Sequence, residues 1–223
     1  MKLIEYPDQE MMMIDVANHL AGELAEYVMH HDAASFAVPG GTTPGPIFDV
    51  LCAADLDWSR VHVVLTDERW VPEDHERSNS RLIRERLLTD RAAAARYLPL
   101  YTGAAEPEAA LDDMCAKLAD ELPISVLLLG MGADMHTASL FPGADRLEDA
   151  LRSDAPVLMP MRAPGAGEPR VTLTARVLNG ALKKHVLIFG AEKRAALEAA
   201  AGLSAREAPI NAVLDGATVH WAE

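Results

Sequence analysis

The stretch LLLGMGADMHTASLFPG, residues Leu127–Gly143, carries the strongest signal for the fold of this 223-residue chain. Its aliphatic run is cut by Gly130 and Gly132, which is the pattern of a buried strand that leaves its sheet. In an open α/β sheet, ligands bind at the carboxyl ends of the strands. Asp134 and His136 follow the glycines directly and are therefore expected at that edge. Asp134 and His136 are interpreted either as residues that take part in a reaction or as a turn aspartate and a surface histidine without such a role.

Short aliphatic runs predict buried strands along the whole chain, at Ser35–Val38, Val61–Leu65, Ile124–Leu129, His185–Phe189 and Thr218–Trp221. Apolar residues at helical spacing lie between them, as in the series Leu111, Met114, Leu118, Leu122 and the series Val16, Leu20, Leu24, Tyr27. The stretch AEKRAALEAAA near residue 195 is rich in strong helix formers. Strands that alternate with helices predict an α/β fold with a mostly parallel, helix-covered sheet.

The composition is that of a single domain spanning residues 1–223, with 50% hydrophobic residues available for a core. The Pro/Gly-rich stretch Arg162–Arg170 is expected to be a flexible loop, and it is too short to divide domains. The formal net charge of −14 argues against nucleic acid or an anionic membrane as partner, because both need a basic face. A small anionic substrate would have to be held by a few local cations.

The two cysteines, Cys52 and Cys115, are isolated in helix-like stretches, so they are expected to be core thiols in a reducing compartment. The N-terminal stretch has no cationic and apolar signal pattern, and no segment reaches 18 uninterrupted apolar residues. A soluble, cytoplasmic protein is expected.

The stretch AVPGGTTPGPIFDVL, Ala37–Leu51, predicts a strand that passes into a helix through Gly40, Gly41, Thr42 and Thr43. Threonine before Pro44 suits an N-cap with proline at the first helical position. Glycines that allow close backbone approach, hydroxyl donors and free N–H groups together form a cradle for a phosphate. The alternative is an ordinary strand-to-helix turn.

Charged residues follow the strand Val61–Leu65 in the stretch VVLTDERWVPEDHERSNSRLI. Asp67, Glu68 and Arg69 are expected where that strand ends, and Ser78 or Asn79 can cap the following helix. The alternative is a solvated charge cluster.

Two late cations are also candidates. Arg170 lies in EPRVTLTARVLN, and Lys193 follows the strand that ends at Phe189, at the start of a helix. A lysine in the first helical turn opposes the helix dipole unless an anion offsets its charge.

His136 is a candidate general base, because a nearby carboxylate such as that of Asp134 can fix the tautomer of an imidazole and raise its basicity. A metal site is less well supported, since one histidine and one aspartate are too few ligands and the sequence offers no HxxxH pair or cysteine partner.

Taken in order, GGTTPG, TDERWVP…SN, GMGADMHTASLFPG, RVTLT…LN and GAEKRAAL resemble the successive signatures of the 6-phosphogluconolactonase family, over residues 37 to 197. The resemblance implies a doubly wound α/β sheet covered by helices on both faces, related to that of glucosamine-6-phosphate deaminase. It also implies hydrolysis of 6-phospho-D-glucono-1,5-lactone to 6-phosphogluconate in the oxidative pentose phosphate pathway.

This chemistry assigns a role to each candidate residue. His136 would deprotonate water for attack at C1, and Asp134 would orient His136 or shape its loop. Arg69 would polarise the carbonyl or hold sugar hydroxyls, with Asp67 organising its loop. The phosphate would lie on Gly40, Gly41, Thr42 and Thr43, held by Arg170 and Lys193. The reaction requires no metal and no organic cofactor, and the protein is expected to act as a monomer or a homodimer.

Met135 departs from the family pattern, which usually has glycine between the aspartate and the histidine. If that position is left-handed, methionine costs roughly 1–2 kcal/mol there. A deaminase-isomerase is disfavoured, because that family continues with asparagine and glutamate, as in GHIAFNEP, where this chain has TASLFP. A non-catalytic sugar-phosphate sensor is the other alternative.

Overall fold

A computed structural model describes residues 1–223, and its centre is a seven-stranded sheet in which every neighbouring pair is parallel. From one edge to the other its strands are β1 (Lys2–Glu5), β10 (Thr218–Ala222), β9 (Lys183–Phe189), β6 (Val126–Gly130), β2 (Ala34–Val38), β3 (Val61–Leu65) and β5 (Arg96–Leu98). The central strands are buried on both faces, which explains their unbroken aliphatic sequences.

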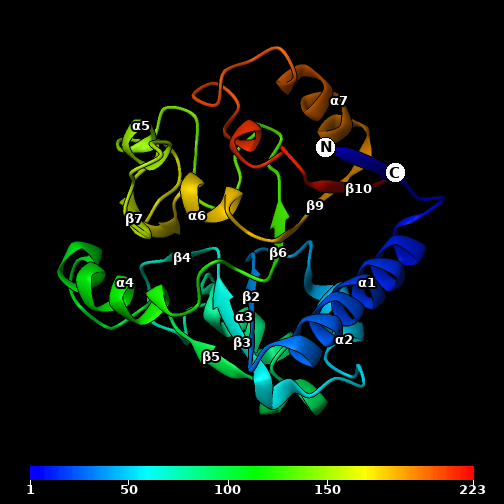
Figure 1. The fold of residues 1–223 in the computed structure, drawn as a ribbon. Helices are drawn as coiled ribbons and strands as arrows, with labels where there is room; N and C mark the ends of the chain where they lie inside the picture. Colours follow the sequence, from blue (N-terminus) through cyan, green and yellow to red (C-terminus); the bar gives the residue numbers. More distant parts are fainter.

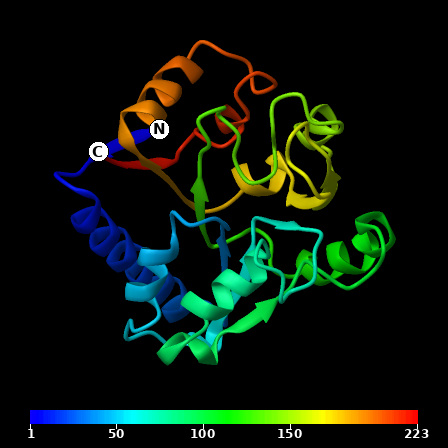
Figure 2. The same ribbon diagram turned by 180° about the vertical axis from the view of Figure 1, so that it is seen from behind.

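Helices cover both faces of this sheet (Figure 1). Helices α1 (Gln9–His30), α2 (Gly45–Leu51) and α3 (Asn79–Arg86) pack side by side, as Figure 2 shows from behind. Helix α7 (Gly190–Ala200) lies on the other side of β10 from α1 (Figure 1). Right-handed crossovers require this arrangement, because the chain moves outward from β2 in one direction and from β6 in the other.

A second, antiparallel sheet of three strands lies beyond the carboxyl ends of the main sheet. Its order is β4 (Asp67–Arg69), β8 (Arg170–Leu173) and β7 (Leu158–Met161). The sequence did not predict this sheet. The predicted loop at Arg162–Arg170 is the connection between β7 and β8, and its last residue begins β8.

The remaining elements are short. They are the helices α4 (Leu111–Ala119), α5 (Leu147–Ala150) and α6 (Ala175–Asn179) and 3₁₀ turns at Trp58–Arg60, Asp90–Ala94, Pro107–Ala110 and Pro209–Ala212. Cys52 is buried, Cys115 is half-buried against the core, and neither forms a disulfide. No helix is long and apolar enough to span a bilayer.

The predicted strands are confirmed, each to within two residues of its observed ends. The predicted helices are confirmed as α1, α4 and α7, although α4 ends at Ala119 and leaves Leu122 outside. The predicted cap at Thr43 is wrong. Helix α2 begins at Gly45 with Pro44 as its N-cap residue, because Thr42 to Gly45 form a turn closed by the Gly45 N–H donating to the Thr42 carbonyl at 3.3 Å.

The strand order reverses between β2 and β6, so the loops that follow these two strands diverge to opposite sides. This topological switch point is where doubly wound sheets bind ligands. The loop after β2 carries Gly40 to Thr43, and the loop after β6 carries Asp134 and His136. The fold therefore brings together two stretches that lie about ninety residues apart in the sequence, because parallel strands that are neighbours in the sheet can be distant in the chain.

Candidate active site

His136 and Asp134 form a hydrogen-bonded pair at the end of β6. Asp134 Oδ1 lies 2.5 Å from His136 Nδ1. Because a carboxylate only accepts, Nδ1 carries the hydrogen, and Nε2 keeps a free lone pair in the neutral imidazole. The imidazole lies directly over Gly132, where an added Cβ would be 2.2 Å from His136 Nδ1. Glycine is therefore needed at 132 for the pair to form.

The loop that holds this pair has an unusual backbone. Met135 has φ 65° and Ala138 has φ 48°, both in the left-handed region. Hydrogen bonds fix the turn, since the Gly132 N–H donates to the His136 carbonyl and the Ile210 N–H donates to the Met135 carbonyl, each at 3.0 Å. The condition set for Met135 from the sequence is met: this non-glycine residue is in the conformation that glycine adopts more readily.

Asp67 and Arg170 come from the small antiparallel sheet, where β4 pairs with β8. Asp67 Oδ2 accepts a hydrogen bond from the Ser139 hydroxyl at 2.6 Å, and Arg170 Nη1 lies 3.8 Å from the same oxygen. The side chain of Asp67 is therefore bound within the protein. It links the loop after β6 to strands β4 and β8 of the small sheet.

Arg170 is a buried cation with spare hydrogen-bonding capacity. The residue is 8% exposed, and its Nε is buried without a hydrogen-bond partner. Burial lowers the pKa of Arg170, and the nearby Asp67 carboxylate partly offsets this effect. Arg69 Nη1 donates to the Arg77 carbonyl at 2.8 Å, while Arg69 Nε is likewise buried and unpaired. Both guanidiniums can bind an anion or a polarised oxygen.

Glu68 has a structural role that the sequence did not reveal. The residue is fully buried, and its carboxylate accepts hydrogen bonds from the N–H groups of Arg69, Asn79 and Ser80, each at 2.8 Å. Burial raises the pKa of Glu68, and these donors oppose that change. Of the two predicted caps, Ser78 and Asn79, Ser78 is the N-cap of α3 and accepts from the Arg81 N–H at 3.2 Å. Glu68 thus attaches β4 to the start of α3.

Asn79 is a pocket residue that the sequence pointed to only as a helix cap. Its Nδ2 donates to the Asp67 carbonyl at 2.9 Å. Its side chain also occupies the space beside Gly40, where an added Cβ would be 1.9 Å from Asn79 Oδ1. Gly40 therefore lets the loop after β2 pass close to the start of α3.

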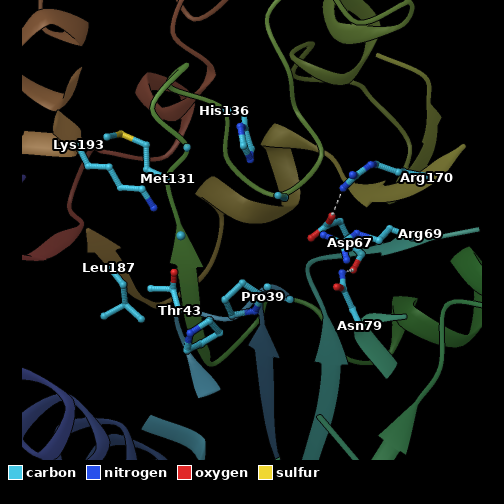
Figure 3. Close-up of a pocket in the computed structure, with 16 residues that line it drawn as sticks. Pro39, Thr43, Asp67, Arg69, Asn79, Met131, His136, Arg170, Leu187 and Lys193 are labelled. Atoms are coloured by element: carbon cyan, nitrogen blue, oxygen red, sulfur yellow. Dashed lines mark hydrogen bonds and ion pairs between the residues drawn. The ribbon is translucent and has the colours of Figure 1, made fainter. Parts of the chain in front are cut away.

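Most of the predicted site residues meet in one pocket, which Figure 3 shows. Lys193 and Arg170 project from opposite sides of it, and His136 lies between them. Two predicted residues do not line it: Thr42 is exposed, and Asp134 contacts His136 from outside the pocket. The residues that line it include Gly40, Gly41, Thr43, Asp67, Arg69, His136, Arg170 and Lys193, together with Asn79, Met131 and Ala138, for which no site role was predicted.

A doubly wound parallel sheet with a histidine–aspartate pair and three cations around one pocket at its switch point is the architecture of an α/β protein whose ligand site lies at the carboxyl ends of its strands. Residues 7–221 match the family described as Glucosamine-6-phosphate isomerases/6-phosphogluconolactonase, and the chain belongs to this family.

Its relatives carry a more specific name. It is 42% identical over 214 residues to a 6-phosphogluconolactonase of Rhizobium meliloti, covering 93% of this chain and 92% of that protein. It is 41% identical to one of Pseudomonas aeruginosa, covering 92% of this chain and 88% of that protein. A crystal structure of a 6-phosphogluconolactonase from Shewanella baltica superposes with a TM-score of 0.96 at 32% identity, covering 100% of this chain and 97% of the other.

The fold extends to a different activity. A monomeric glucosamine-6-phosphate deaminase superposes with a TM-score of 0.79 at 17% identity, covering 100% of this chain and 98% of the other. At that identity the likeness concerns the fold alone, so the assignment of an activity depends on the site.

Proposed function

We propose that this protein hydrolyses 6-phospho-D-glucono-1,5-lactone to 6-phosphogluconate, as a cytoplasmic step of the oxidative pentose phosphate pathway. One observation carries the proposal above the others. The hydrogen-bonded pair of His136 and Asp134 faces a pocket that also holds Arg69, Arg170 and Lys193. A base beside several cations suits a sugar phosphate lactone, because the base can activate water for attack at the uncharged carbonyl carbon while the cations bind the phosphate. The lactonase names of the relatives support the same reaction.

His136 acts as the general base. Its Nε2 takes a proton from water while the oxygen of that water forms a bond to C1 of the lactone. Asp134 accepts the Nδ1–H and stabilises the imidazolium that results. The bond between C1 and the ring oxygen then breaks and C1 becomes the carboxyl group. The ring oxygen takes up a proton and becomes the C5 hydroxyl, and the imidazolium gives up its proton, so one water is consumed and neutral His136 is restored. A positioned general base of this kind contributes about 10²–10⁴ in rate.

Arg69 is assigned to the carbonyl oxygen or the neighbouring hydroxyls, because its guanidinium is a cation that lines the pocket near His136. Asp67 organises this side of the site through Ser139 and Arg170. The phosphate is assigned to the loop Gly40–Thr43, with Arg170 and Lys193 as its cations. Thr42 does not line the pocket, so the loop residues that face it are Gly40, Gly41 and Thr43. Charge-assisted hydrogen bonds of this type contribute about 1.5–3 kcal/mol each.

A sugar-phosphate sensor is the second candidate function. Such a sensor would bind the sugar phosphate through its cations without hydrolysing the lactone. The strained Met135 beside His136 is the observation that favours this function. A deaminase-isomerase lacks support, because the segment after His136 reads TASLFP and supplies no carboxylate.

Lactone consumption, measured against spontaneous hydrolysis in an assay coupled to glucose-6-phosphate dehydrogenase, tests the proposal. We expect the wild type to accelerate hydrolysis and His136→Ala to lose about 10²–10⁴ in turnover with its fold intact. His30→Ala, at an exposed histidine near the end of α1, is the matched control and should keep full activity. A wild type that binds 6-phosphogluconate and hydrolyses nothing would support the sensor. A folded His136→Ala enzyme with the wild-type rate would end the general-base assignment.

A further inference from the structure

Phe141 lies beside the proposed site and outside the hydrophobic core. The chain has four phenylalanines. Phe36 and Phe48 are fully buried in the core, and Phe189 packs against it. Phe141, in contrast, is half-buried and belongs neither to the core nor to the partly buried side chains that cover it. A contribution to core packing therefore does not explain its position.

The ring of Phe141 contacts two residues of the site. Its centroid lies 4.3 Å from that of the His136 imidazole, with the planes tilted by 32°. The guanidinium carbon of Arg170 lies 5.1 Å from the same centroid. A single ring thus separates the proposed base from the buried cation. Arg170 needs such support, because its Nε has no partner and its contact with Asp67 is a long 3.8 Å.

An aromatic ring suits this place on physical grounds. It is rigid beyond its first two torsions, and its π face attracts a guanidinium or an imidazolium without donating or accepting a proton. A polar side chain would instead compete with the substrate for the guanidinium of Arg170 or the free Nε2 of His136, both of which line the pocket. An aliphatic side chain would fill the volume but offer no π face, which would leave His136 with Asp134 alone and Arg170 with only its long contact to Asp67.

We propose that Phe141 is a positioning residue, which holds His136 and Arg170 at a fixed separation so that the base faces C1 while the guanidinium holds the phosphate. This inference rests on the function proposed above. Phe141 touches neither the substrate nor the reacting atoms in this scheme, since it does not line the pocket. It acts through the two residues that do.

Three variants test the inference: Phe141→Leu, which keeps an apolar side chain, Phe141→Tyr, which keeps the ring, and Tyr101→Leu as control. Tyr101 is also half-buried, and its ring packs edge-on against Trp70 at 5.1 Å, away from the pocket. We expect Phe141→Leu to lower kcat and to raise the Kd of 6-phosphogluconate, each by about 3- to 10-fold, the range that aromatic and cation–π contacts provide. Phe141→Tyr should stay within about twofold of the wild type, and Tyr101→Leu should change neither constant.

Double variants separate a positioning role from general damage to the fold. In an Arg170→Ala background, Phe141→Leu should cause no further loss of 6-phosphogluconate binding, and in a His136→Ala background no further loss of kcat. Additive losses in both backgrounds, or a failure of Phe141→Tyr to restore the constants, would overturn the inference. If the wild type hydrolyses no lactone, the proposed function fails separately. The binding cycle, repeated with inorganic phosphate, still decides whether Phe141 supports Arg170.

Discussion

At the scale of single residues, Met135 is the point where the chain departs from the pattern of its family. Its φ of 65° is left-handed, which costs a side-chain-bearing residue roughly 1–2 kcal/mol. Its side chain is half-buried and packs against the core, so the same residue also stabilises the fold. These two effects oppose each other, and substitutions can separate them.

Comparison of Met135→Gly with Met135→Ala isolates the strain. Both variants lose the methionine contacts, but only glycine relieves the left-handed backbone. We expect the glycine variant to be more stable than the alanine variant by about 1 kcal/mol, the reverse of their order in a helix. Against the wild type, the glycine variant should be equal within about 1 kcal/mol and at least as active, because relief of strain is offset by lost packing. Urea denaturation measures the order.

Gly22 supplies a control position at which alanine should be more stable than glycine, the reverse of the order expected at position 135. It is exposed, lies inside α1, and an added Cβ would meet no atom within 4 Å. Gly22→Ala should therefore raise the free energy of unfolding by about 0.5–1 kcal/mol. An alanine variant at 135 that is clearly more stable than the glycine variant, at an unchanged denaturant slope, would contradict the strain at that position.

Lys193 and Arg170 give the second residue-scale prediction. Lys193 makes no ion pair or hydrogen bond through its ammonium group, and Arg170 keeps Nε unpaired. Each change to alanine should weaken 6-phosphogluconate binding about 10- to 150-fold, the equivalent of about 1.5–3 kcal/mol, and should impair binding of unphosphorylated gluconate far less. Calorimetric titration of both ligands checks this. Equal losses for the two ligands would remove these cations from the phosphate.

At the scale of elements, sequence reasoning succeeded where burial is continuous. Aliphatic runs in the sequence predict the strands that are covered on both faces, which are β2, β3, β6, β9 and β10. Strand β4 carries the sequence DER and has no such signal. It becomes a strand by pairing with β8, a contact that spans about a hundred residues and that no local pattern records.

The same limit explains why Glu68 was not singled out. A glutamate in a charged run is usually solvated, yet Glu68 is fully buried because β4 pairs and α3 begins beside it. The site residues that follow strand ends, by contrast, were predictable from topology alone. Parallel strands end at one edge, so Gly40, Asp67, His136 and Lys193 had to lie near one another.

Glu68→Gln tests the attachment of β4 to α3. The wild-type carboxylate accepts three backbone hydrogen bonds and one at 2.6 Å from the Ser80 hydroxyl. An amide has only one accepting oxygen, so its NH₂ group would face donors. We expect a loss of about 2–4 kcal/mol in the free energy of unfolding, from charged hydrogen bonds and buried unpaired donors. Chemical denaturation measures it, and a loss below about 0.5 kcal/mol would show that the attachment is dispensable.

At the scale of the whole molecule, a buried polar network joins the N-terminal and C-terminal segments of the chain. The Tyr6 hydroxyl donates to Asp15 at 2.7 Å and accepts from His220 Nδ1 at 2.9 Å. His220 Nε2 in turn accepts from His185 Nδ1 at 2.9 Å, and Glu23 lies 2.8 Å from His185 Nε2. The network ties α1 to β9, β10 and the end of β1.

This network predicts a loss of stability in mild acid. Burial, followed by the proximity of His185 and His19, lowers the pKa of His220 to about 3, although Asp15 acts in the opposite direction and Lys2 adds a small repulsion. The unfolded chain binds a proton at this histidine below about pH 6.5 while the folded chain does not, so stability falls as the pH drops from about 6.5 toward 3. Between pH 7.5 and 5.0 the loss from His220 should be roughly 2 kcal/mol, since one pH unit within this range corresponds to about 1.4 kcal/mol.

His220→Gln removes this titration while the other groups remain, so the stability difference between wild type and variant should shrink by that amount at pH 5.0. Urea denaturation of both proteins at the two pH values measures it, with near-ultraviolet circular dichroism confirming a native fold at pH 5.0, and a difference that stays constant or widens would mean that folded His220 takes up the proton as readily as the unfolded chain.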